Sequence, residues 1–263
     1  MPELPEVEIM ARNLHGWLAG RTVTSVEVID TKFETIDGAE LMGRTVSRVT
    51  RRGKYAVVWL EAGPVIVLHY RMTGKTVLDP GRSRSARLRL IADGTVVVAF
   101  EDPRRFGTVE VLERGDVDAF FSRKRLGPEP WPEFRPSVWW SERLGSVRSP
   151  IKIALMRQDR VAGLGNIAAS EILYRSGIHP TVSADQLSAE QWGRIAESVH
   201  AFIEHTLDQE SGEEIQYVNQ GGEGSFSVYG HAGSPCSHCA TPIERIVQSG
   251  RGTFFCPECQ PLS

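Results

Sequence analysis

Long hydrophobic runs are missing from this chain. Its longest apolar stretches, residues 55–60 and 95–100, have the length of a β-strand, whereas a helix that spans a bilayer needs about 20 apolar residues. The amino terminus carries acids where a secretory signal would carry basic residues and then an apolar stretch. We therefore expect no membrane association and a cytoplasmic location.

Internal repeats, low-complexity tracts and a coiled-coil seam are absent as well. Because no self-association element is evident, we expect a monomer. The hydrophobic content of 41% and the charged content of 24% are those of an ordinary globular protein. A length of 263 residues suffices for one large domain or for two smaller ones, each with its own core.

An excess of positive charge is also lacking. The net charge of -3 and the pI of about 6.2 argue mildly against a nucleic-acid partner. The cations are clustered, however: residues 44–54 hold five cations and no acid, and further basic clusters lie at 82–89, 104–105 and 123–125. A charge run is usually a solvated face, but four basic clusters in one predicted sheet domain favour a track for a polyanion.

Cysteine is scarce, and its four copies are confined to the last 28 residues. They form two Cys-x2-Cys pairs separated by sixteen residues: Cys236, Cys239, Cys256 and Cys259. This spacing is typical of a zinc ribbon, in which two knuckles at the ends of a hairpin hold one tetrahedral metal ion. Disulfides are the alternative, which a cytosolic chain makes less favourable. We predict one structural Zn²⁺ that supplies the folding free energy of this small module.

Two further residues of the cysteine segment are candidates for a binding role. His238 lies between the first two cysteines and could ligate a metal, but four thiolates already fill a tetrahedral site. Arg251, at the tip of the expected hairpin, is a candidate phosphate contact.

The first eight residues place a proline directly after the initiator methionine. Once Met1 is removed, Pro2 becomes a secondary amine at the chain end, able to attack a carbonyl-type carbon and form an iminium. Glu3 lies beside it and Glu6 one helical turn further on, so carboxylates are available for proton transfer. The alternative is that Pro5 and the acids merely begin a helix, where prolines and carboxylates are favoured.

The periodicity predicts an α+β protein. An amphipathic helix with Val7, Met10, Leu14, Trp17 and Leu18 on one face opens the chain. Short β-rich runs follow near 22–29, 45–50, 55–60, 65–70, 86–91, 95–100 and 107–112, with a hairpin turn at Asp93-Gly94. Strands at this spacing indicate an antiparallel sandwich or barrel.

Helical periodicity begins beyond residue 150. Helices are expected at 151–156 and 167–175, and a third begins at Ser188 with Gln191 completing a capping box. The expected domains are a β-sandwich at 1–125, an ordered linker at 126–149, a helical domain at 150–227 and a zinc hairpin at 228–263.

Taken together, several motifs make the chain resemble the formamidopyrimidine-DNA glycosylase / endonuclease VIII family of base-excision repair enzymes. The resemblance covers essentially the whole chain, and the opening Glu-Leu-Pro-Glu is similar to the formamidopyrimidine branch. The motifs are Pro-Glu-Leu-Pro-Glu-Val-Glu at 2–8, Arg-Arg-Gly-Lys-Tyr at 51–55, His-Tyr-Arg-Met-Thr-Gly at 69–74, Asp-Pro-Arg-Arg-Phe-Gly at 102–107, Leu-Gly-Pro-Glu-Pro at 126–130, Val-Ala-Gly-Leu-Gly-Asn-Ile at 161–167 and Val-Tyr-Gly at 228–230.

The resemblance implies a bifunctional glycosylase and lyase of the bacterial cytosol or nucleoid. Such an enzyme removes oxidised purines, 8-oxoguanine and formamidopyrimidines, from double-stranded DNA through a Schiff base and β,δ-elimination. The helical domain would then be a helix–two-turn–helix. The implied catalytic residues are Pro2, Glu3 and Lys54, with Glu6 in support. Lys54 also resembles a DNA-contacting lysine, and it can both hold the phosphate beside the lesion and assist the acid–base steps.

The resemblance also implies two sets of DNA contacts. His69 and Asn166 resemble phosphate contacts. Met72, Arg104 and Phe106 resemble a triad that fills the gap left by an extruded base; from spacing alone, Met72 and Phe106 would instead be sandwich core.

Two other functions stay open at this stage. The 219–226 loop is shorter than is usual in the family, which keeps an oxidised-pyrimidine enzyme of the endonuclease VIII type as an alternative. A catalytically idle relative that only binds damaged DNA is the second alternative, and the presence of Pro2 and Glu3 speaks against it.

Overall fold

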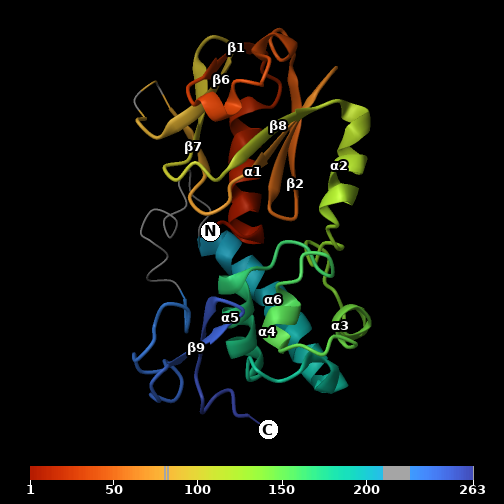
Figure 1. Ribbon diagram of the computed structural model, residues 1–263, viewed down its shortest axis with the longest axis vertical. Coiled ribbons are helices and arrows are strands. Elements are labelled where there is room, and N and C mark those ends of the chain that lie inside the picture. The colour runs from red at the N-terminus through yellow and green to blue at the C-terminus, as the bar shows by residue number, and fades with distance from the viewer. Residues whose placement is uncertain (80, 82, 210–225, 263) are drawn as a thin grey trace. The chain divides into compact units, whose positions relative to one another are not determined.

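A computed structural model describes residues 1–79, 81, 83–209 and 226–262 (Figure 1). The chain divides into two compact units. The first is formed by Met1–Lys124, and the second by Arg125–Gln209 together with the described residues from 226 onward. The expected α+β class is confirmed, since one unit is built mainly of strands and the other mainly of helices.

The first unit contains two four-stranded antiparallel sheets. In one sheet the strand order is β1 (Val23–Val28), β6 (Ala86–Ala92), β7 (Val96–Glu101) and β5 (Lys75–Leu78). In the other it is β2 (Val46–Arg52), β3 (Tyr55–Leu60), β4 (Val65–His69) and β8 (Thr108–Leu112). The predicted sandwich is therefore confirmed. Strand β5 was not predicted, because four residues are too few for a clear alternation.

The sequence pattern explains several of these strands. β6 alternates between buried and half-buried residues along its whole length, as expected of a strand with one face on the core. The predicted hairpin turn joins β6 to β7, with Asp93 at φ 49° and Gly94 at φ 70°. Two positive φ values match the type I′ turn that Asp-Gly favours.

Helix α1 (Leu4–Leu18) packs mainly on β2 and β3. Its predicted apolar face is confirmed in large part: Val7, Met10, Leu14 and Leu18 are buried, and Trp17 is half-buried. A second helix of this unit, α2 (Val117–Lys124), follows β8 and was not predicted.

The second unit holds four helices and a hairpin among its described residues. They are α3 (Ser137–Leu144), α4 (Ile151–Leu155), α5 (Asn166–Ser176), α6 (Ala189–Gln209), β9 (Glu244–Gln248) and β10 (Arg251–Phe255). The capping box of α6 is confirmed: Ser188 N donates to Gln191 Oε1 at 2.8 Å, and Gln191 N donates to Ser188 Oγ at 3.2 Å.

Helix α3 was missed by the sequence analysis. It lies within 126–149, where an ordered linker was expected, and it packs against α6. The prolines around it disguise its pattern, because proline usually marks a boundary. Trp140 and Leu144, on its buried side, are completely shielded from solvent.

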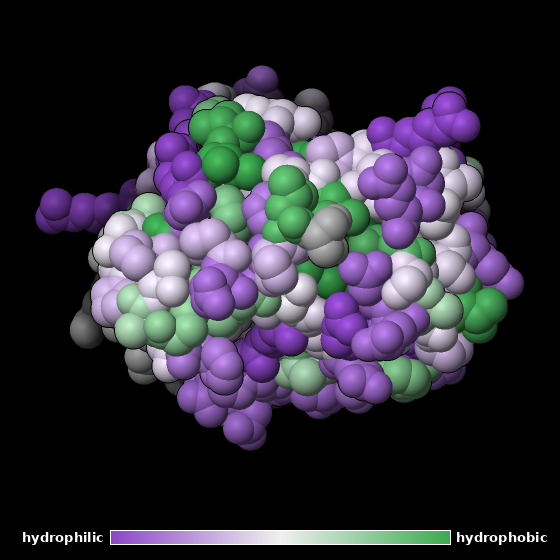
Figure 2. Space-filling model, turned by 90° about the horizontal axis from the view of Figure 1, so that it is seen from below, coloured by the Kyte–Doolittle hydropathy of each residue, from purple (hydrophilic) through white to green (hydrophobic). Residues whose placement is uncertain are grey.

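The molecular face in Figure 2 is largely hydrophilic, and its hydrophobic residues form separate patches. Among all described residues, the exposed large apolar side chains include Met72, Phe106, Phe134, Val138 and Val247. Single exposed apolar residues are normal, so the surroundings of each decide whether it matters. Within the described ranges, none of the helices has both the length and the hydropathy needed to cross a membrane.

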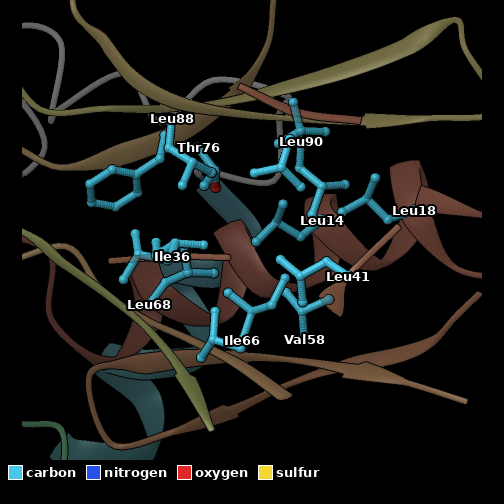
Figure 3. A pocket seen from close by; sticks show the side chains of 15 residues that line it. Leu14, Leu18, Ile36, Leu41, Val58, Ile66, Leu68, Thr76, Leu88 and Leu90 are labelled. Carbon is cyan, nitrogen blue, oxygen red and sulfur yellow. The ribbon is translucent and has the colours of Figure 1, made fainter. Parts of the chain in front are cut away.

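The side chains that line a small void inside the sandwich come mainly from both sheets and from α1 (Figure 3). Leu14 and Leu18 of α1 lie between residues such as Leu88 of β6 and Ile66 of β4, and they surround a void of about 30 Å³. Among the described residues that line the void, Thr76 alone is polar, and its hydroxyl lies 3.2 Å from the hydroxyl of Tyr70. A void this small and apolar belongs to the core and is no substrate site.

Candidate functional site

The amino-terminal residues form a buried helix start. Glu3 is the N-cap of α1, and its N–H donates to Glu6 Oε2 at 2.6 Å, an arrangement of the capping-box type. The side chain of Pro2 is buried, and Glu3 and Glu6 are each only 3% exposed, whereas Met1 is 39% exposed. Glu3 and Glu6 thus do begin a helix, as the alternative to a catalytic role proposed. In doing so, Glu6 fixes the backbone at Pro2 and Glu3.

Lys54 lies in the turn between β2 and β3, directly after Gly53, whose φ is 58°. Its side chain is mostly buried. The turn is anchored by Arg51, which donates to Gly53 O at 3.0 Å and pairs with Glu8 Oε2 of α1 at 3.0 Å. The ion pair therefore connects the turn that carries Lys54 to helix α1, which begins directly after Pro2 and Glu3.

His69 ends strand β4 and packs edge-on against Tyr55, with ring centroids 4.4 Å apart. Burial, followed by the charges of Arg71, Lys54 and Lys124, lowers the pKa of His69 to about 3. The Arg71 N–H donates to His69 Nδ1 at 3.1 Å, so the neutral ring carries its proton on Nε2. Such a ring can donate one hydrogen bond to a phosphate without adding charge.

Met72, Arg104 and Phe106 lie on two loops of the first unit. Met72 is 43% exposed and Phe106 is 50% exposed, so neither side chain belongs to the sandwich core. The Arg104 guanidinium lies 4.8 Å from the centre of the Phe106 ring. An exposed methionine and an exposed arginine–phenylalanine stack are suited to contact with unstacked bases.

Asn166 is the first residue of α5 in the second unit. Its Nδ2 donates to Gly252 O of β10 at 3.0 Å, and its Oδ1 accepts from Lys152 Nζ at 2.5 Å. Lys152 is completely buried and was missed by the sequence analysis. The Gln158 side chain holds the segment just before α5, because it donates to Leu164 O and accepts from Gly163 N.

Arg251 is exposed at the start of β10, after a turn with Ser249 at φ 49° and Gly250 at φ 73°. Because Asn166 bonds the neighbouring Gly252, the structure brings the start of α5 and the tip of the zinc hairpin together. Backbone N–H groups at a helix start favour anions, so Asn166 and Arg251 form one candidate anion-binding surface.

The four cysteines converge at one point. Their sulfurs all lie within 4.8 Å of one another, and three of the pairs are 3.4, 3.5 and 3.8 Å apart. Four sulfurs bound to one zinc at about 2.3 Å in a tetrahedron lie about 3.8 Å apart. His238 is not part of this group; its backbone N–H donates to Cys236 Sγ at 3.4 Å. The cluster fits one structural zinc.

Helix α5 supports the metal site. The Tyr174 hydroxyl lies 3.2 Å from Cys236 Sγ. The buried carboxylate of Glu171 accepts the backbone N–H groups of Ser227, Val228 and Tyr229 at 2.8 to 2.9 Å, which fixes the segment that leads into the ribbon. Both residues were missed, since neither spacing nor composition marks them.

The expected shortening of the 219–226 loop falls, apart from Phe226, outside the described residues.

Comparison with known proteins gives matches along the whole chain. Three family models match: the formamidopyrimidine-DNA glycosylase N-terminal domain at residues 1–109, its H2TH domain at 126–216, and a zinc finger found in FPG and IleRS at 233–262. Formamidopyrimidine-DNA glycosylases of Bacillus subtilis and Streptococcus mutans are 37% and 36% identical to the chain, and each alignment covers 99% of both proteins.

Solved structures agree with these matches. A complex of Lactococcus lactis Fpg with DNA containing an abasic site superimposes with a TM-score of 0.87, at 31% identity, over 99% of this chain and 100% of that one. A complex of the same protein with DNA containing Fapy-dG gives the same values. The chain therefore belongs to the formamidopyrimidine-DNA glycosylase family.

Proposed function

We propose that this protein removes oxidised purines from double-stranded DNA and then cleaves the strand at the resulting abasic site. The observation that carries the proposal is the buried helix start, which holds Pro2 between an exposed Met1 and two buried carboxylates. Family membership supports excision of a damaged base. The strand cleavage and the residue roles below are our inference.

The reaction begins when the Pro2 nitrogen, freed by removal of Met1, attacks C1′ of the damaged nucleoside. A C–N bond forms, and the base departs with the electron pair of the glycosidic bond. The Pro2 nitrogen then loses its proton and the C1′–O4′ bond breaks; its electron pair leaves with O4′, which takes up a proton, and the C=N bond of the iminium forms. The iminium draws electrons from C2′–H, so a carboxylate within reach can accept that proton while the 3′-phosphate leaves in β-elimination. Glu3 is the residue we assign to this proton transfer. Glu6 positions it through the Glu3 N–H.

In this proposal, four residues bind phosphates of the DNA backbone. Lys54 and Arg251 supply charge, while His69 and Asn166 supply neutral donors. The zinc site holds the hairpin that carries Arg251, and four thiolates leave it no open position for substrate. Its role is therefore structural.

Met72, Arg104 and Phe106 occupy the space left by the extruded nucleotide. Methionine and phenylalanine suit insertion between stacked bases, and an exposed arginine can read the base on the opposite strand.

The second candidate is the excision of oxidised pyrimidines. The observation that favours it is a complex of Lactococcus lactis Fpg with DNA containing an oxidised pyrimidine, at a TM-score of 0.88. An idle DNA-binding relative is less favoured, because Pro2 and Glu3 lie at a buried and capped helix start.

We further propose that the catalytic domain spans 1–125, a linker 126–149, the helix–two-turn–helix domain 150–227 and the zinc hairpin 228–263. The substrate requires that the protein work where the chromosome lies, in the bacterial cytosol or nucleoid.

Trapping with borohydride tests the proposal. Purified protein is incubated with duplexes that carry 8-oxoguanine, formamidopyrimidine, thymine glycol or an abasic site, and borohydride then reduces any imine to a stable adduct. We expect an adduct with the purine lesions and the abasic site, and none with Pro2→Gly. Glu3→Gln retains the nucleophile, so it should slow the turnover of an abasic site while still binding DNA.

The other outcomes are distinct. Adducts with thymine glycol alone would establish the second candidate. DNA binding without an adduct or strand cleavage would establish the idle relative. A full adduct yield with Pro2→Gly would refute the requirement for the secondary amine of the Pro2 ring, since the glycine still offers a primary terminal amine.

A further inference from the structure

The two loops that expose Met72 and the Arg104–Phe106 stack are joined at their base by one buried carboxylate. Asp102 is 1% exposed. Its Oδ1 accepts the Thr73 hydroxyl at 2.6 Å, and its Oδ2 accepts the Gly107 N–H at 2.6 Å. Thr73 directly follows Met72, and Gly107 directly follows Phe106. The carboxylate therefore connects the flanks of the two exposed side chains.

The 102–107 loop is held firmly on its other side. Arg105 has φ 59°, a strained value for a side chain other than glycine. Its Nε and Nη2 donate to Asp30 Oδ2 and Oδ1, each at 2.7 Å, and Lys32 Nζ donates to Arg105 O at 2.9 Å. At Gly107 an added Cβ would lie 2.5 Å from the Phe100 ring, so the loop closes tightly around the carboxylate.

The loop around Met72 is equally tight. Arg71 has φ 55°, and Gly74 N donates to Tyr70 O at 2.9 Å. A Cβ at Gly74 would lie 2.4 Å from that same oxygen, so only glycine fits there. The hydroxyl of Thr73 is thus presented to Asp102 by a turn with little freedom.

We propose that Asp102 and Thr73 are positioning residues that set the spacing between Met72 and the Arg104–Phe106 stack. The inference rests on the proposed function, in which these side chains enter one gap in the duplex. Insertion is effective only if Met72, Arg104 and Phe106 reach the gap together. If their spacing is already fixed in the free protein, binding does not have to pay the entropy of ordering the two loops. Hydrogen bonds to a carboxylate are strong enough to hold such a spacing.

The test compares two variants, Thr73→Val and Thr73→Ser. Valine keeps the shape and removes the hydroxyl, whereas serine keeps the hydroxyl as a matched control. Single-turnover reactions use a duplex with 8-oxoguanine and a neighbouring 2-aminopurine, whose fluorescence reports unstacking. Adduct formation is measured in parallel on a single-stranded abasic oligonucleotide, which offers no stacked gap to fill.

We expect Thr73→Val to slow both unstacking and excision by about tenfold, the effect of losing one hydrogen bond to a carboxylate. Thr73→Ser should react at nearly the original rate. Both variants should trap the single-stranded abasic site as the unchanged protein does. Asp102→Asn can still accept the Gly107 N–H but offers Thr73 an N–H in place of an acceptor, so its effect should fall between those of Thr73→Ser and Thr73→Val.

Two results would overturn the proposal. One is Thr73→Val acting on the duplex at the original rate. The other is an equal loss on the single strand and the duplex with a lowered melting temperature, which would reduce the contact to fold stability. Failure of the proposed function looks different: the unchanged protein would give the fluorescence change without any adduct. In that case the comparison of valine with serine still decides the role of Thr73.

Discussion

At the residue scale, charge separates the four proposed phosphate contacts into two kinds. Lys54 and Arg251 are cations, so alanine at either position should reduce the slope of log Kd against log salt by about 1. His69 is neutral, because burial and nearby cations lower its pKa to about 3. His69→Gln should therefore weaken binding without changing the slope. Fluorescence anisotropy with a duplex carrying a stable abasic analogue measures both quantities.

Arg148→Ala is a suitable control, since Arg148 is a highly exposed cation without a proposed DNA contact. An unchanged slope for Lys54→Ala would contradict its phosphate contact. A reduced slope for His69→Gln would mean that the ring binds DNA as an imidazolium.

The same pKa predicts how stability depends on pH. In the unfolded chain, His69 binds a proton below its ordinary pKa of about 6.5, whereas the folded state resists protonation down to about 3. Stability should therefore fall as the pH drops from about 6.5 toward 3, because the unfolded state binds more protons. Urea denaturation at pH 7 and pH 4.5 should show a smaller acid loss in His69→Gln than in the unchanged protein.

His205→Gln changes an exposed histidine of α6 and serves as the comparison. Equal acid losses in the two variants would show that the burial of His69 does not govern this dependence.

For single residues, the sequence patterns predicted which residues belong to the candidate site better than they predicted which residues contact one another. Motifs marked Met72 and Phe106, but spacing alone favoured core positions, and only their exposure in the fold decides against that. Asp102 is the first residue of the motif at 102–107, but the sequence does not show its partner. Its link to Thr73 spans 29 positions of the chain, so it becomes visible only when β4, β5 and β7 are assembled.

At the element scale, a hydroxyl from α5 contacts one sulfur of the zinc ribbon. Tyr174 lies 3.2 Å from Cys236 Sγ and would donate to the metal-bound thiolate. Tyr174→Phe should lower zinc affinity by about tenfold, since groups that hydrogen-bond a ligand typically contribute that much or more. Competition with a chromophoric chelator measures the affinity.

Tyr229→Phe keeps a ring that packs 5.0 Å from Phe254 and should leave zinc affinity unchanged. If Tyr174→Phe bound zinc as tightly as this control, the hydroxyl would have no part in holding the metal.

Elements with strong local signals were predicted well. The α6 start was marked by Ser188 and Gln191, and the ribbon by its cysteine spacing, because both depend on residues close in sequence. Helix α3 and strand β5 were missed for the opposite reason. α3 is stabilised by packing on α6 rather than by its own pattern, and β5 by pairing with β7.

At the scale of the whole molecule, the proposed chemistry and the zinc site belong to different compact units. Leu14 borders the core void of the first unit, so Leu14→Ala should lower the free energy of unfolding by about 2 to 5 kcal/mol. Zinc affinity should be unaffected, because the cysteines lie in the second unit. Calorimetry and chelator competition on the same sample provide the two measurements.

Val247→Ala, at an exposed position of the hairpin, is the control for stability. A loss of zinc affinity in Leu14→Ala that matched its loss of stability would mean that the two units do not fold separately.

The helix start at Leu4 also has a practical consequence for anyone who makes this protein. A purification tag fused ahead of Pro2 would turn the ring nitrogen into an amide, whose lone pair is delocalised and no longer nucleophilic. The tagged product should still recognise lesions while leaving the strand intact. Such a fusion would be a stable probe for damaged sites, and removing the tag by a protease that leaves proline first would restore cutting.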